Sequence, residues 1–130
     1  MSESFSVPEN VRAAARRGLE LRKKNKRGGF DTQQASEHKV GSGVQRASDL
    51  ISGSVSYETV KRMKSFFARH SAYKKHHSDH TSAAYISWQL WGGDAGESWA
   101  NRIVREEEAR REREKDSVRK SLAAFIEEFK

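Results

Sequence analysis

Apolar residues recur at helical spacing in the first part of the chain. Over residues 8–27, Val11, Ala15 and Leu19 fall four positions apart, which places them on one face of an α-helix. Gly28 follows the last basic residues and is typical of a helix end. The pattern therefore predicts a helix over residues 8–27 with one buried face and polar side chains on the others.

Two further helices are predicted in the middle of the chain. Residues 44–52 carry their apolar side chains on one stripe, and Gly53 closes that segment. Residues 57–70 have apolar side chains at i, i+3 and i+7, with Ser56 in the position of an N-cap. This outline is similar to a helix-turn-helix, but the slightly long connection favours a plain helical hairpin in a core.

The segments around these helices are shorter or more polar. Residues 28–43 have glycines at both ends and no sustained period, which predicts a loop with a short turn near residues 33–37. Residues 71–81 are polar and are interpreted as a connector. Residues 82–91 begin with a capping serine and are nearly all apolar, so we predict a short buried helix there.

The C-terminal third has the pattern of a long, charged helix. Asp94 and Glu97 have the spacing of a capping box, which marks its start. Residues 105–116 are almost purely charged, with acid-before-base pairs at i, i+4 that stabilise an exposed helix. Apolar side chains then return at helical spacing, as Val118, Leu122, Phe125 and Phe129. Either the charged part is a solvated strut whose end meets a partner, such as a second copy, or this stripe folds back after a break.

No stretch shows the two-residue alternation of a strand flanked by turn residues. We therefore predict an all-α fold, in which a compact bundle of four or five helices carries an extended, charged C-terminal helix. The expected organisation is a flexible N-terminus at residues 1–7, a helical domain at residues 8–104 and a charged extension with an amphipathic end at residues 105–130.

Composition narrows the class of protein. The chain has 130 residues, no Cys and no apolar run long enough for a membrane span, so we expect neither disulfides nor contact with a membrane. Residues 1–78 contain 16 basic and 7 acidic side chains, whereas residues 79–130 contain 9 basic and 11 acidic ones. This uneven distribution indicates a basic surface for a polyanionic partner, although Lys and Arg that merely keep the protein in solution are the alternative.

The first helix is the leading candidate for that surface, because cations along a helix can follow a phosphate backbone. The residues that we expect to bind nucleic acid are Arg12, Arg16, Arg17, Lys23, Lys24, Lys26 and Arg27, with Lys61, Arg62, Lys64 and Arg69 extending the surface. The segment 27–30 (Arg-Gly-Gly-Phe) adds a flexible basic and aromatic element of a kind found with single strands. A solvated face, or a docking site for an acidic protein, is the alternative.

Other groups of residues give weaker indications of a functional site. His76, Asp79 and His80 are weak candidates for a metal site, but they lack a clear fourth ligand, so we expect no bound metal and no cofactor. Trp88, Trp91 and Trp99 flank a glycine-rich turn, which predicts a tight corner between two helices clamped by indoles. No glycine-rich phosphate loop, nucleophile elbow or paired-carboxylate arrangement is present, so we do not expect an enzyme.

Several ordered blocks of the sequence carry a resemblance to a known family. These blocks are ARRGLELRKK with the following RGG, SGVQRASDLISG, VSYETVKRMKSFFARH and AAYISWQLWGGDAGESWA. Over about residues 7–104 the chain resembles a small module of tailed bacteriophages and prophages, which is found alone or fused to head-region proteins. The resemblance implies a viral origin and a link to head assembly or DNA handling, and it carries no catalytic residue with it.

These observations lead to three hypotheses of function. The first is a non-catalytic phage protein that binds nucleic acid, DNA more readily than RNA, largely through the phosphate backbone. The second is a structural or assembly component of the virion head, which contacts head proteins or a second copy through the C-terminal stripe. The third is a small regulator that inhibits a host protein. The expected locations are the host cytoplasm and the virion.

Overall fold

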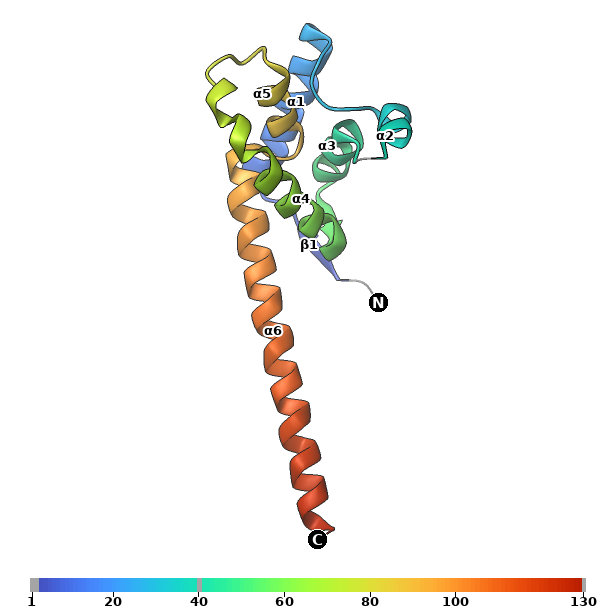
Figure 1. Ribbon diagram of the computed structural model, residues 1–130, viewed down its shortest axis with the longest axis vertical. Coiled ribbons are helices and arrows are strands. Elements are labelled where there is room, and N and C mark those ends of the chain that lie inside the picture. Colours follow the sequence, from blue (N-terminus) through green and yellow to red (C-terminus); the bar gives the residue numbers. More distant parts are fainter. Residues whose placement is uncertain (1–2, 40, 130) are drawn as a thin grey trace.

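The computed structural model describes residues 3–39 and 41–129 and confirms an all-α fold with a compact head and an extended final helix (Figure 1). Residues 1, 2, 40 and 130, which include parts of the predicted N-terminal segment, loop and extension, lie outside the described residues. The elements in chain order are β1 (Ser4–Ser6), α1 (Glu9–Asn25), α2 (Thr32–His38), α3 (Gly43–Ile51), β2 (Ser54–Ser56), α4 (Tyr57–His70), the 3₁₀ helix η1 (Ser71–His76), α5 (Ala83–Leu90) and α6 (Gly93–Glu128).

The core of the head lies between α1, α4, α5 and the first turns of α6. Its largest fully buried side chains include Trp88, Phe67, Leu50 and Met63, which come from α5, α4 and α3. The rings of Phe67 and Trp88 meet edge to face, with 4.7 Å between their centroids. The apolar stripes that predicted α3, α4 and α5 are thus the surfaces that build this core, although Ala83, at the start of α5, is exposed.

Glycines are required at two places in the head, a close contact between helices and a sharp turn. A Cβ atom at Gly18 on α1 would lie 2.6 Å from the backbone nitrogen of Leu90, so α1 and α5 touch backbone to backbone there. Gly92 and Gly93 adopt φ values of +117° and +67° and turn the chain sharply from α5 into α6. The tight corner predicted between these helices is therefore present.

The predicted capping box at the start of α6 is wrong. The N-cap is Gly92, which makes no side-chain cap, and Asp94 lies inside the first turn of the helix. Its carboxylate instead accepts a hydrogen bond of 2.7 Å from the indole N–H of Trp88. The sequence pattern suggested that Asp94 would cap its own helix. In the structure its partner is Trp88 of the preceding helix α5, which the turn at Gly92 brings close.

Two predictions for irregular segments also need correction. Within the predicted loop over residues 28–43, the expected short turn is the two-turn helix α2, because Asp31 and Gln34 form a reciprocal capping box at its start. The expected flexible N-terminus does not hold for residues 4–7. Strand β1 pairs antiparallel with β2, and Val7 is buried at the end of that pair.

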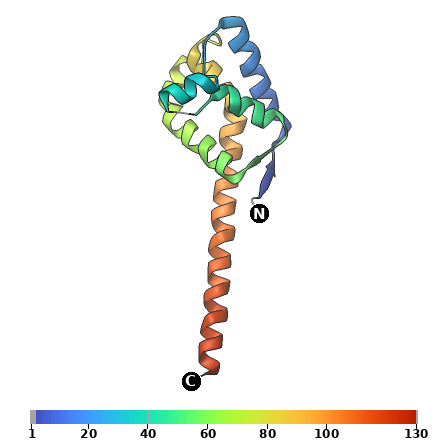
Figure 2. The same cartoon turned by 90° about the vertical axis from the view of Figure 1, so that its right-hand side faces the viewer.

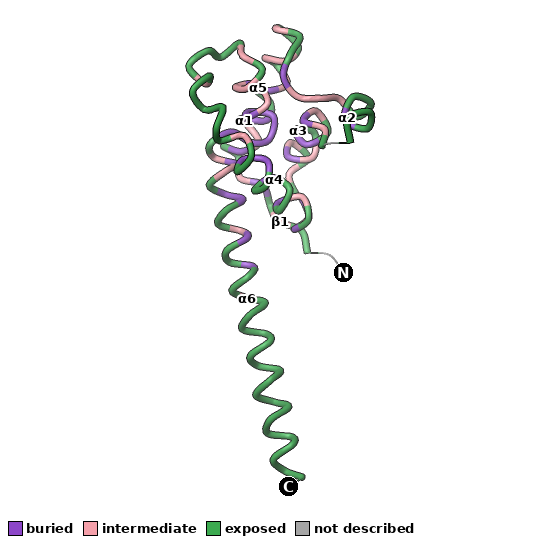
Figure 3. Tube along the Cα trace, in the orientation of Figure 1, coloured by how far each residue is buried: buried purple, intermediate pink, exposed green. Residues whose placement is uncertain are grey.

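Helix α6 leaves the head as a straight strut (Figures 1 and 2). Its 36 residues span about 54 Å at 1.5 Å per residue. Burial along it ends at Glu107, and beyond Arg110 every described residue is exposed (Figure 3). Of the two alternatives for the charged segment, the structure therefore has the solvated strut.

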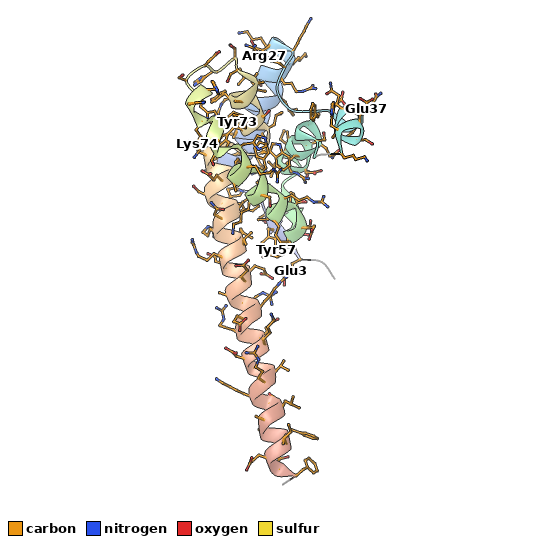
Figure 4. The ribbon with its side chains drawn as sticks, viewed as in Figure 1. Glu3, Arg27, Glu37, Tyr57, Tyr73 and Lys74 are labelled. Carbon is orange, nitrogen blue, oxygen red and sulfur yellow. The ribbon has the colours of Figure 1, made fainter. Side chains whose placement is uncertain are left out.

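Charged and aromatic contacts fix the point where α6 leaves the head. Glu107 is buried and accepts hydrogen bonds from Arg110 and Arg111, and the bond from Arg110 is the main reason that the pKa of Glu107 is lowered. The guanidinium of Arg111 lies 4.5 Å from the ring centroid of Tyr57, and Arg110 also pairs with Glu3. Glu3 and Tyr57 both lie beside this part of the helix (Figure 4). The head therefore holds the strut through about residue 111, somewhat beyond the boundary expected at 104.

Candidate nucleic-acid interface

The cations in the first half of α1 are partly engaged by a single acid. Arg12 and Arg16 both pair with Glu9, at 2.8 and 2.9 Å, and the hydrogen bond from Arg16 is the main cause of a lowered pKa of Glu9. Arg17 donates to the side-chain oxygen of Gln89 at 2.8 Å. Arg16 and Arg17 nevertheless remain exposed, so this part of α1 presents positive charge to solvent.

The end of α1 presents further exposed cations. Arg27 donates to the carbonyl and hydroxyl oxygens of Thr81, at the end of the head opposite to Glu3 and Tyr57 (Figure 4). Three lysines of this stretch are exposed and make no ion pair with any residue that the structure describes, namely Lys23, Lys24 and Lys26. Within residues 3–39 and 41–129, no cation of α1 is paired with a carboxylate of α6.

Helix α4 lies on a different side of the head from α1 (Figure 2). A Cβ atom at Gly92 would touch Val11 of α1 and come within 3.6 Å of Met63 of α4, so the buried faces of both helices turn toward this glycine. Their exposed faces therefore point away from each other. The four predicted cations of α4 form a second basic surface and do not extend the first one.

A groove beside α4 gathers cations from three elements. It encloses about 570 Å³ and includes a single carboxylate, Glu58, among the described residues that line it. Its cations are Lys39, which caps α2, Arg46 of α3, and Lys61, Arg62 and Arg69 of α4. We call this hollow the α3–α4 groove. The fourth predicted cation of α4, Lys64, is exposed but does not line it.

Arg46 is the fixed charge of this groove. It is only 7% exposed, and its guanidinium lies 5.1 Å from the ring centroid of Trp91. One terminal nitrogen donates to Asp49 at 3.2 Å and to the Thr59 hydroxyl at 3.3 Å, whereas Nε has no hydrogen-bond partner among the described residues. Burial lowers the pKa of Arg46; the charge of Asp49 opposes this effect and the like charge of Arg62 adds to it.

The groove holds more positive than negative charge after its internal pairs are counted. Glu58 pairs with Lys61 at 3.0 Å, and the hydrogen bond from Lys61 lowers the pKa of Glu58. Arg62 and Arg69 are exposed and pair with no carboxylate in the described part of the chain. The repulsion between these cations costs free energy that a bound anion would relieve.

Sequence reasoning missed Lys39 and Arg46. Arg46 lies in a short helix whose predicted stripe was apolar, and Lys39 lies inside the segment 28–43 that was expected to be a loop. Neither position has a local signal for binding, because the groove exists only once α2 and α3 pack near α4. The clustering of aromatic residues around Trp91 is the one hint that the sequence contained.

The segment 27–30, expected to be flexible, is held in place. A side chain at Gly28 would collide with Ile86, and the backbone N–H of Gly29 donates to the Ser87 hydroxyl at 2.9 Å. The ring of Phe30 stacks on His38, with centroids 4.9 Å apart. These contacts make the segment a wall of the head.

The residues considered for a metal site are engaged elsewhere. The carboxylate of Asp79 accepts bonds from the backbone and hydroxyl of Thr81, and the ring of His80 stacks on Tyr85 at 4.2 Å. His76 ends η1, so it does not share an α-helical face with His80. No group of three potential ligands is found among the described residues.

Comparisons with known proteins identify no relative of this chain. No family model, curated protein or solved structure matches this chain. Across the described residues, no helix combines the length and the apolar character needed to cross a lipid bilayer.

Proposed function

We propose that this protein binds nucleic acid, DNA in preference to RNA, and that the α3–α4 groove contacts the phosphate backbone. The observation that carries the proposal is the convergence of five cations on a hollow with one carboxylate among its described lining residues. A buried arginine that is already desolvated and oriented loses little entropy when a phosphate binds to it.

The exposed cations of α1 supply a second, weaker contact. They lie on a convex helix surface, and two of them share Glu9 as a partner. Surface cations of this kind attract a polyanion over a distance set by the salt concentration, without fixing its position. The resemblance to a phage module supports DNA as the polyanion, since a phage head contains DNA at high density.

Salt-dependent binding tests this proposal. Fluorescence anisotropy of labelled DNA should show a steep fall in affinity with salt, with a slope of about 0.9 for each phosphate contacted. We expect Arg62→Glu with Arg69→Glu to weaken binding by about a hundredfold and to reduce the salt slope by about 2.

The matched control changes the same amount of charge outside the groove. Arg105→Glu with Arg113→Glu alters two exposed arginines of α6 and should weaken binding only slightly. Reversal of Arg16, Arg17, Lys23 and Lys24 should have an intermediate effect. Equal losses for the groove and control variants would contradict the groove as the site, and binding without salt dependence would contradict phosphate contact altogether.

The end of α6 favours a second candidate function, assembly with other protein chains. Its apolar side chains are more than half exposed, namely Val118, Leu122, Phe125, Ile126 and Phe129. Without Ile126, these side chains alternate spacings of four and three residues, as in a coiled-coil seam, which supports pairing with a second copy or with a helix of a head protein. Sequence reasoning named four of these residues and missed Ile126.

Measurement of mass by light scattering tests self-association. We expect the wild-type protein to be oligomeric and the variant Phe125→Glu with Phe129→Glu to be monomeric. The matched control, Ala123→Glu with Ala124→Glu, places the same charges on the opposite side of the helix and should keep the oligomer. A monomeric wild-type protein would exclude pairing between copies.

A further inference from the structure

A second hollow adjoins the α3–α4 groove. It encloses about 440 Å³, which lies within the range of about 300–1,000 Å³ that is usual for small-molecule sites. Its walls come from the segment 28–30, from the start of α3 and from α4 and α5. We call it the aromatic cavity. It shares Gly41, Arg69 and Trp91 with the groove, so a chain that follows the cations reaches its mouth.

Rings dominate one side of this cavity. Phe66 is stacked between His70 and Trp91, with centroid distances of 4.1 and 4.4 Å. Phe30, half-buried, contributes a further ring to the lining. A Cβ atom at Gly41 would lie 3.1 Å from Cη2 of Trp91, so the missing side chain at this position leaves the passage between groove and cavity open.

The cavity also offers hydrogen-bonding groups of both kinds. Nδ1 of His70 lies 2.9 Å from the carbonyl oxygen of Phe66, which only accepts, so Nδ1 carries the proton and Nε2 of the neutral ring is an acceptor. The indole N–H of Trp91, beside Gly43, donates to no described residue. Phe66 and Trp91 are covered by neighbours on their faces. By contrast, Phe30 and His70 each stack on one described ring only, so these two rings match the face of a nucleobase. The nearby donor and acceptor match its edge.

We propose that the aromatic cavity receives an unpaired nucleobase of the strand whose phosphates lie in the α3–α4 groove. This inference rests on the proposed function and adds that the preferred ligand is single-stranded or has an unpaired end. A paired base is stacked inside the duplex and enters a pocket only after it has been flipped out. Arg69, which lines both hollows, is positioned to hold the phosphate next to that base.

Three DNA probes of equal length separate base contacts from phosphate contacts. They are a single strand, its duplex, and a strand with abasic sites that keeps the phosphates but lacks bases. At one salt concentration, we expect the single strand to bind about tenfold more tightly than either other probe, as expected for one stacked base. Equal affinity for the single and the abasic strand would overturn the inference.

A variant that fills the cavity gives an independent test. Ala83 lines the cavity, is exposed and begins α5, so Ala83→Trp occupies the space without removing a cation. It should lower the affinity for the single strand to that for the abasic strand, whereas Ala109→Trp, on the exposed side of α6, should not. If Ala83→Trp lowers the melting temperature, Ala83→Leu replaces it.

The outcomes distinguish this inference from the proposed function. Two results would contradict the base site but not the phosphate groove. One is salt-dependent binding with the same affinity for strands with and without bases. The other is an affinity for the single strand that Ala83→Trp does not change. Failure of the wild-type protein to bind any of the three probes overturns both.

Discussion

The head and the distal half of α6 are both helical, but the head buries its apolar residues whereas the distal half of α6 exposes them. Phe67 in the head is 1% exposed, whereas Phe125 near the end of α6 is 59% exposed. In the head, side chains from distant parts of the sequence cover one another. Beyond Arg111, the ion pairs and ring contacts that the structure describes, such as Arg119 with Asp116 and Phe125 with Phe129, join residues that are close together along α6.

This difference shows what keeps each region folded. The distal half of α6 has ion pairs such as Arg119 with Asp116 at 3.0 Å and Arg110 with Glu114. Each such pair stabilises an exposed helix by only about 0.2–0.5 kcal/mol. The strut therefore persists as the continuation of a helix that the head has already nucleated, and its apolar stripe contributes nothing to the stability of the head.

The same substitution in the two regions gives the largest expected contrast. Phe67→Ala should lower the free energy of unfolding of the head by about 3–5 kcal/mol, because it leaves a cavity in a packed core. Phe125→Ala should change it by less than about 0.5 kcal/mol. Urea unfolding followed by fluorescence measures both, since Trp88, Trp91 and Trp99 all lie in the head. Similar losses would mean that the end of α6 packs on the head.

Substitutions between glycine and alanine should show the same contrast between head and strut, with smaller changes in stability. Gly18→Ala forces α1 and α5 apart, since its Cβ atom would lie 2.6 Å from a backbone atom, and should destabilise the head by about 1–3 kcal/mol. Ala124→Gly, at an exposed position of α6 well beyond Arg111, should cost about 1 kcal/mol of local helix stability and reduce helical ellipticity. It should leave the unfolding midpoint of the head unchanged, and a shifted midpoint would contradict the independence of the strut.

Acidification should produce the smallest effect, and only in the head. Burial lowers the pKa of His77, whose Nε2 has no hydrogen-bond partner in the described structure; Asp94 opposes this effect, and Lys74 and His76 add to it. The unfolded chain, with an ordinary pKa of about 6.5, then takes up the proton first. The stability present above pH 6.5 is therefore lost as the pH falls through 6.5 toward the lower pKa of the folded state.

Substitution of His77 checks this assignment. The urea midpoint should fall less between pH 7.5 and 5.5 for His77→Phe than for the wild-type protein. The matched control is Lys75→Phe, because Lys75 is an exposed neighbour whose charge is not among those that shift the pKa of His77, so this variant should keep the wild-type pH dependence. Parallel pH profiles for all three proteins would show that His77 does not titrate differently in the folded state.

Helix positions were predictable because their signals are local. The stripe of residues 57–70 and the cap at Ser56 correspond to α4, whose N-cap accepts a hydrogen bond from Thr59. The segment 82–91 likewise corresponds to α5 with its cap at Ser82. The strands and α2 were missed, because three-residue strands show no alternation and α2 has just one buried residue, Ala35.

Individual cations of the candidate site could be predicted from the sequence, but their arrangement in space could not. Lys61, Arg62 and Arg69 stand out as exposed cations of an amphipathic helix, and the structure places all three in the groove. Their separation from the α1 cations, and their meeting with Lys39 and Arg46, depend on which faces of α1, α3 and α4 turn inward together.

The sequence by itself determined that this chain is helical, basic in its first three-fifths and charged along its last helix, since periodicity and charge are properties of neighbours along the chain. Only the tertiary structure decided that Arg46 is buried against Trp91, that two basic surfaces face different ways, and that a cavity of rings opens beside one of them. Those features join residues from separate helices, and their distances are set by core packing and by close contacts at positions such as Gly18 and Gly92.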